Sequence, residues 1–448
     1  MQTTLDPGEL AGHAGRLRAA NERFARLYPG ESGARQPVHT VYGGAHLFRH
    51  DTTAKLGQLA RRALAEYAPG AATLANAIGM EDGELAERVY RRVGEKLARE
   101  PVEDFRIDFE DGYGNRPDAE EDGHALSAAR EVAKGLAEGT LPPFIGIRVK
   151  PLSEELRGRA IRTLDLFLTA LVDATRGTLP ANFVATVPKV ALTEEVEYFA
   201  AVLRALEAKL GLSADSLRFE IMVEAPQAIV GADGRCMLPE LVRAGGGRIG
   251  AAHFGTYDYT AGVGISAAHQ QMRHPAATFA RHLMQVSLAG TGVWLSDGAT
   301  TVMPVPVHRG AALTAGQMDE NRAGVHRAWK LHYGDVRHSL AGGFYQGWDL
   351  HPAQLPTRFA AVFAFFLESM DSAGARLRNF VEKAAQATLV GDVFDDAATG
   401  QGLLNQFLRG INCGALSERE AVEMTGLSAD ELRGRSFLKI LQGRRMLG

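Results

Sequence analysis

The sequence has little cysteine, little net charge and no long hydrophobic run, and each absence excludes a class of protein. Cys236 and Cys413 are the only cysteines among 448 residues, too few for a disulfide framework or a cysteine-based zinc site. The formal net charge of −4 gives no general attraction to nucleic acid or to an anionic membrane. No stretch approaches 18 uninterrupted apolar residues, and the amino terminus lacks the pattern of a secretory signal. We therefore expect a cytoplasmic protein with neither a nucleic-acid nor a membrane partner.

Phosphate-binding loops of the GxGxxG and GxxxxGK[ST] types are also missing, which disfavours a nucleotide-binding α/β fold. The sequence is nevertheless that of a globular protein, since 46% of the residues are hydrophobic and 23% are charged. Strand-like segments occur near residues 40, 107, 146, 185, 221, 251, 293 and 346, and helical patterns separate most of them. Eight alternating units of this kind predict an α/β protein with a (β/α)₈ TIM barrel.

Helical patterns extend the chain on both sides of the predicted barrel. A leader helix is expected over residues 6–27, and the sequence after Leu355 is helical in pattern to its end. The expected domains are a leader over 1–36, a catalytic barrel over 37–355 and a helical extension over 356–448. The strand expected over 292–295 ends near Asp297.

Two apolar runs end in acids, and this pair is the first candidate site. Glu224 follows the run FEIMV, and Asp258 follows the run IGAAHFGTY. Because ligands collect at the carboxyl ends of parallel strands, two carboxylates there would suit Mg²⁺ or Mn²⁺ with water and an oxyacid completing the shell. The alternative is that both acids cap the helices that follow.

Three earlier strand ends carry further charged residues. Glu110 and Asp111 follow the strand expected over 105–109, where they either support a metal-bound water or an arginine, or simply end the strand. Arg148 ends the next strand and offers a planar fork to a carboxylate or an enolate, unless it forms a structural salt bridge. Lys150 is expected to face solvent. Lys189 follows a third strand, behind a proline.

The order of these motifs resembles the HpcH/HpaI aldolase and citrate lyase β-subunit superfamily, which is related to malate synthase. The resemblance is carried by VYGGAHLF, IDFEDGYG, GIRVK, VPKV, VEAPQAI, FGTYDYTAGVG and GFYQGWDLHPAQL, which occur in the right order over about residues 37–355. Three positions depart from the motifs of that group. Ala225 stands where a threonine is usual, Lys150 replaces an asparagine, and Trp348 or Gln346 replaces a lysine.

The resemblance implies that Glu224 and Asp258 bind Mg²⁺, which holds the oxygens of a 2-oxo or 3-hydroxy acid. Arg148 would share the charge of an enolate, as a catalytic and substrate-binding residue. Backbone amides at Gly255 and Thr256 would hold the substrate carboxylate. Glu110 and Asp111 would orient Arg148 or a metal-bound water, and Lys189 would face the substrate or pair with one of these acids, the pairing being favoured.

The expected function is therefore that of a Mg²⁺-dependent carbon–carbon lyase, or of the reverse aldol or Claisen condensing enzyme. Whether the substrate is a CoA thioester stays open. The alternatives are a phosphoenolpyruvate- or pyruvate-handling enzyme such as a phosphotransferase, or a non-catalytic scaffold. No residue stands out as the general base. We also expect a homo-oligomer in which the helical tail packs over a barrel mouth, that of a neighbouring subunit.

Overall fold

Eight parallel strands close into a barrel, and the strand order follows the sequence without interruption. The computed structural model describes residues 10–30, 34–382, 388–390, 393–395 and 397–445. The prediction of a TIM barrel is confirmed, and each strand lies where an apolar run predicts it. The strands are β1 (His39–Gly44), β2 (Asp104–Asp108), β3 (Phe144–Arg148), β4 (Phe183–Val187), β5 (Arg218–Val223), β6 (Ile249–Phe254), β7 (Trp294–Ala299) and β8 (Gln346–Asp349).

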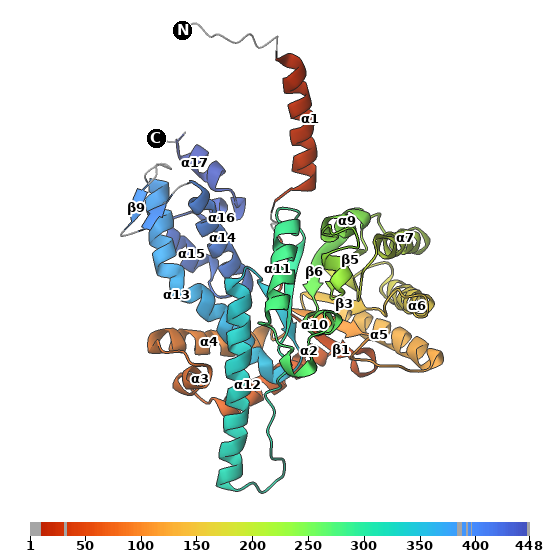
Figure 1. Cartoon of the computed structure of the whole chain (residues 1–448). Helices are drawn as coiled ribbons and strands as arrows, with labels where there is room; N and C mark the ends of the chain where they lie inside the picture. The colour runs from red at the N-terminus through yellow and green to blue at the C-terminus, as the bar shows by residue number, and fades with distance from the viewer. Residues whose placement is uncertain (1–9, 31–33, 383–387, 391–392, 396, 446–448) are drawn as a thin grey trace.

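Helices join successive strands and surround the barrel (Figure 1). Between β1 and β2 lie η1 (Ala45–Leu47), α2 (Thr52–Tyr67), α3 (Ala71–Ile78) and α4 (Gly83–Arg99). The next three connections are α5 (Asp118–Glu138), α6 (Arg157–Thr175) and α7 (Thr193–Leu210). The rest are α8 (Pro226–Ile229) with α9 (Leu238–Ala244), then α10 (Thr256–Gly262), η2 (Ala267–His269) and α11 (Pro275–Leu288), and finally α12 (Ala315–Ala341). A capping box of Thr314 and Gln317 begins α12.

The inward face of the barrel is polar, which the apolar pattern of the strands does not suggest. On β2 every residue is buried, and Arg106 lies inside a network with Asp104, Thr186 and Glu220. Its Nε is 3.0 Å from Thr186 Oγ1 and its Nη2 is 2.7 Å from Glu220 Oε2. Because buried charges need such partners, this network lies in the barrel interior with its charges paired.

Strand β7 is longer than the sequence predicts, and Asp297 lies inside it rather than near its end. The Asp297 carboxylate is buried and accepts hydrogen bonds from Arg281 Nη1 at 2.9 Å and from Ser339 Oγ at 2.6 Å. The glycine that follows, Gly298, has the pattern of a turn, but here it continues the strand. Asp297 therefore binds the barrel to α11 and α12.

The helical tail packs on helices of its own barrel, and its expected placement over the mouth of a neighbouring subunit stays a prediction. It comprises η3 (Pro352–Gln354), α13 (Leu355–Glu382), α14 (Ala397–Cys413), α15 (Glu418–Thr425), α16 (Ala429–Gly434) and α17 (Phe437–Arg445), with the short strands β9 (Thr388–Val390) and β10 (Val393–Asp395). Helix α13 contacts α4 and α12 and buries Phe359 and Phe363 completely; each such side chain stabilises the fold by about 1.5–3 kcal/mol. Capping boxes at Ser417 and Ser428 begin α15 and α16. The homo-oligomer stays a prediction.

Helix α1 (Ala11–Leu27) is the expected leader, and the first residues of the predicted range lie outside the described residues. Figure 1 shows that it stands away from the barrel, and none of its residues is buried. Leu17 and Phe24 are 61% and 64% exposed. None of the described helices has the length and apolar composition needed to cross a membrane.

Candidate active site at the carboxyl ends of the strands

Arg148, the last residue of β3, is held by a carboxylate that the sequence interpretation missed. Its Nε and Nη2 lie 2.7 and 2.5 Å from the two carboxylate oxygens of Asp108, the last residue of β2. Asp108 also accepts the backbone N–H groups of Glu110 at 3.0 Å and Gly112 at 2.7 Å. Asp108 is fully buried, so one carboxylate fixes both the guanidinium and the loop after β2. The D-x-R-x-D pattern of β2, which places three charges on one face, is the signal that could have shown it.

The remaining edge of Arg148 faces the candidate site. Its Nη1 lies 3.0 Å from Glu110 Oε2 and 3.7 Å from Asp111 Oδ2. The Tyr42 ring of β1 covers the guanidinium at 4.7 Å from Cζ to the ring centroid, and Trp348 of β8 packs on Tyr42. Burial opposes the charge of Arg148, but the carboxylates of Asp108 and Glu110 raise its pKa. Arg148 therefore stays charged and presents a single N–H edge.

The paired glycines at the end of β1 serve packing rather than ligand approach. A Cβ on Gly44 would lie 2.3 Å from the carbonyl oxygen of Gly112, and one on Gly43 would lie 2.6 Å from the Phe105 ring. Such contacts are too short for any side chain, so Gly44 lets the loop after β2 approach β1. The backbone of this loop carries Glu110 and Asp111 toward Arg148.

Glu224 follows β5 and is almost completely buried, with 4% of its surface exposed. It is not a helix cap, because α8 begins with Ala225 at its N-cap position. Its Oε1 accepts the backbone N–H of Lys189 at 2.7 Å. Burial, together with the neighbouring Asp258 and Glu110 carboxylates, raises the pKa of Glu224 to about 8 against the opposing effect of Lys189. A cation bound beside such a carboxyl group would stabilise its charged form.

Asp258 lies in the first turn of α10, where an acid also interacts favourably with the helix dipole. Its side chain is 47% exposed, and Oδ2 lies 3.4 Å from Lys189 Nζ. Lys189 Nζ also lies 2.5 Å from Glu110 Oε1, so the favoured pairing of Lys189 with an acid is present. Burial opposes the charge on Lys189, but the ion pair with Glu110 raises its pKa.

The remaining residues of the sequence prediction lie close to Arg148, Lys189 or Glu224. Gly255 and Lys150 differ from the prediction in their contacts. Asp111 is 63% exposed and only 3.7 Å from Lys189 and Arg148. The Gly255 N–H donates to Val223 O at 3.0 Å, so it is already used by the backbone. Thr256 is buried and begins α10. Lys150 does not face solvent, because its Nζ lies 2.7 Å from Phe109 O and 2.8 Å from Glu121 Oε2.

The residues present fit a magnesium ion better than a zinc ion. The site has two positively charged side chains, Arg148 and Lys189. Five carboxyl groups lie around them, so negative groups outnumber positive ones: Asp108, Glu110, Asp111, Glu224 and Asp258. Across the described ranges, no three His, Cys, Asp or Glu side chains form a complete metal cluster. Mg²⁺ needs only one or two protein carboxylates because water and substrate oxygens fill its other positions. Glu224 and Asp258 would be those two ligands.

Gly255 makes room for the Glu224 carboxylate, which gives a steric prediction. A Cβ at this position would lie 2.3 Å from Glu224 Oε2 and 2.5 Å from Glu224 Cβ. We expect Gly255→Ala to displace Glu224, to cost about 1–3 kcal/mol of stability, and to abolish Mg²⁺ binding measured by calorimetry. Gly250→Ala, on β6 just before Gly255, is the control, because a Cβ there meets nothing within 4 Å. Equal Mg²⁺ affinity in both variants would contradict this account of Gly255.

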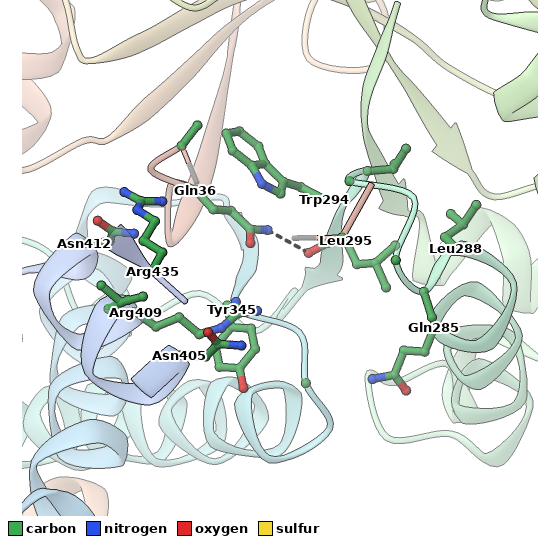
Figure 2. Close-up of a pocket in the computed structure, with 18 of the residues that line it drawn as sticks. Gln36, Gln285, Leu288, Trp294, Leu295, Tyr345, Asn405, Arg409, Asn412 and Arg435 are labelled. Atoms are coloured by element: carbon green, nitrogen blue, oxygen red, sulfur yellow. Dashed lines mark hydrogen bonds between the residues drawn. The ribbon is translucent and has the colours of Figure 1, made fainter. Parts of the chain in front are cut away.

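A hollow lies at the opposite end of the barrel from the residues of the candidate active site, between the barrel floor and the tail (Figure 2). Its volume is about 620 Å³, and its wall includes Val38 before β1, Trp294 at the start of β7, and Tyr345 before β8. From the tail, Asn405 and Arg409 of α14 reach it, and the Arg409 guanidinium lies 3.8 Å from the centroid of the Tyr345 ring. The wall contains none of the charged residues of the candidate active site, such as Arg148, Lys189 and Glu224. The tail of this chain therefore closes the floor of the barrel.

Comparison with known proteins gives a family for the whole arrangement. A family described as a domain of unknown function, DUF6986, matches residues 17–440. The chain belongs to the DUF6986 family. The match includes the barrel, most of α1 and most of the tail, so this DUF6986 chain carries its helical extensions as part of the family pattern. No curated protein is similar enough to the chain to count as a match.

Two solved structures resemble the fold of this DUF6986 chain. A citrate lyase from Burkholderia xenovorans LB400 is 17% identical, with a TM-score of 0.58, over 89% of this chain and 98% of that one. A malate synthase from Haloferax volcanii is 15% identical, with a TM-score of 0.47, over 90% of this chain and 98% of that one. At these identities the likeness to the citrate lyase shows a shared fold.

Proposed function

We propose that the protein is a Mg²⁺-dependent enzyme that breaks or forms a carbon–carbon bond next to the carbonyl group of a small oxo or hydroxy acid. The observation that carries the proposal is the convergence of Arg148, Glu224 and Asp258 at one end of the barrel. Asp108 holds Arg148 through Nε and Nη2, the remaining Nη1 lies beside Glu110, and Glu224 is buried next to Lys189. A scaffold protein has no physical need for this costly arrangement.

The chemistry follows from the charge that such a reaction develops. Breaking a bond next to a carbonyl leaves an enolate, whose negative oxygen is costly to place in a buried site. A bound Mg²⁺ would polarise the carbonyl oxygen and accept part of this charge. Arg148 would donate from Nη1 to the same oxygen, and a fixed donor of this kind contributes about 3–4 kcal/mol to transition-state stabilisation. Glu110 and Asp108 would keep the guanidinium in place.

The substrate carboxylate would lie beside the first turn of α10, where Thr256 offers a backbone amide at the positive end of the helix. Gly255 would contribute space rather than a hydrogen bond, since its N–H is already bonded to Val223. Lys189 does not suit a Schiff-base mechanism, because its ion pair with Glu110 raises its pKa despite burial and a nucleophilic lysine needs a lowered pKa. The likeness of the fold to a structure named a citrate lyase supports the lyase class of this proposal.

Calorimetric titration with MgCl₂ tests the proposal. The parent protein should bind one Mg²⁺, and Glu224→Gln and Asp258→Asn should each bind it at least tenfold more weakly, because each removes a charged ligand. Asp319→Asn on α12 is the control, since Asp319 is 72% exposed and lies outside the site. If both site variants bind Mg²⁺ as well as the parent does, the metal assignment is wrong. If the parent protein binds Mg²⁺ and the site variants do not, a thermal-shift screen of 2-oxo acids and acyl thioesters with Mg²⁺ would identify the substrate class.

A further inference from the structure

Lys189 occupies the centre of the carboxyl groups in a backbone conformation that few lysines adopt. It follows Pro188 after β4 and has a φ of 55°, in the left-handed region, which is unfavourable for a residue with a side chain. This conformation lets one residue use both of its donors at the site. The backbone N–H donates to Glu224 Oε1 at 2.7 Å, and the side chain extends among the other acids.

The Lys189 ammonium group contacts three carboxylates from two different loops. Its Nζ lies 2.5 Å from Glu110 Oε1, 3.4 Å from Asp258 Oδ2 and 3.7 Å from Asp111 Oδ1. Two of these acids follow β2, and Asp258 follows β6, on the other side of Glu224. Lys189 is therefore the cation that joins the acids of one side of the site to the proposed metal ligands of the other.

We propose that Lys189 is a tethered cation that competes with the divalent metal for Asp258, so that the lysine sets how tightly the metal binds. The proposal rests on the function proposed above. A Mg²⁺ ion bound to Asp258 would lie at about 2.1 Å from its oxygen, which leaves it within about 6 Å of an ammonium group in the observed position. At that separation a divalent and a monovalent cation repel each other strongly, even with effective screening.

The Lys189 side chain can move toward solvent when a metal ion binds. It is 35% exposed, and a lysine stem can carry its charge toward solvent without moving the backbone. Movement away from Asp258 leaves the contact with Glu110 available, and it leaves the backbone N–H on Glu224. Metal binding would thus exchange one cation for another at Asp258, while the other contacts of Lys189 persist.

Calorimetry of Mg²⁺ binding to the full chain tests this inference without any substrate. Lys189→Met removes the charge and keeps a similar length and the same backbone donor, so the dissociation constant should fall by about ten- to a hundredfold. Lys189→Arg keeps the charge and should change the affinity by less than about threefold. Lys55→Met is the matched control, because Lys55 is a surface residue on α2 whose side chain is 61% exposed and pairs with Asp51.

The outcomes separate this inference from the proposed function. The competition is supported if Lys189→Met binds Mg²⁺ more tightly than the parent while Lys189→Arg and Lys55→Met do not. It is also supported if Lys189→Met binds Mg²⁺ and the parent does not. Equal or weaker binding by Lys189→Met, with normal binding by the parent, overturns the role of Lys189 and leaves the metal site standing. If neither protein binds Mg²⁺, the proposed function fails and this inference fails with it. Should the methionine variant fold poorly, Lys189→Gln gives the same comparison with a polar side chain.

Discussion

Replacing Arg148 by lysine is expected to lower kcat by about a hundredfold while KM changes little. Lysine keeps the charge but has no planar fork. Arg148 uses all three of its guanidinium nitrogens. Nε and Nη2 bind Asp108, and only Nη1 faces Glu110 and the site. A lysine bound to Asp108 would withdraw its single ammonium group from the enolate oxygen, and losing one donor of this type costs about a hundredfold or more in turnover.

Steady-state kinetics on the acid identified by the thermal-shift screen would measure this effect. Arg159→Lys is the matched control, because Arg159 is similarly buried, with 8% of its side chain exposed, and pairs with Asp122 away from the site. If Arg148→Lys raises KM and leaves kcat unchanged, Arg148 binds the substrate equally in the ground and transition states. The metal would then carry the enolate charge alone.

The fold could be predicted from the sequence because each barrel strand is an apolar run between helical patterns. All eight strands and most of the helices lie where the periodicity predicts them. It was harder to predict whether charged side chains on a strand point into the barrel or toward solvent. In a half-exposed sheet, alternating polar residues mark the solvent face, whereas in β2 the polar face fills the barrel and holds Asp104, Arg106 and Asp108. The residue nearest to Arg148 was therefore overlooked in favour of its two neighbours in the loop.

Lys150 and the tail show a second limit of sequence interpretation. Lys150 follows a strand as a surface lysine would, but its partner Glu121 lies on α5, and no local pattern links the two. The apolar face of the tail was evident, but the surface it covers was not. That surface includes α4 and α12 of the same chain, so the contact depends on segments far apart in the sequence. Contacts between such distant segments form only when the barrel folds, so no local sequence pattern predicts them.

Replacing Asp108 by alanine is expected to destabilise the protein by about 3–5 kcal/mol, the cost of leaving a buried charge without its partner. Asp108 is fully buried and accepts four hydrogen bonds, two from Arg148 and two from the backbone of the loop after β2. Its removal would release the Glu110 and Gly112 amides together with the guanidinium. Glu110 and the Tyr42 ring would still contact Arg148, which keeps the loss toward the lower end of that range.

Chemical denaturation of the parent, Asp108→Ala and Asp111→Ala would test this ranking of neighbouring acids. Asp111 is 63% exposed and no closer than 3.7 Å to Arg148, so its replacement should change stability by less than about 0.5 kcal/mol. Asp108→Asn preserves the shape and one acceptor oxygen, and we expect an intermediate loss because the charge that pairs with Arg148 is gone. If Asp111→Ala destabilises the protein as much as Asp108→Ala does, then the exposed acid holds Arg148. The loop after β2 would in that case adopt a different arrangement around the guanidinium.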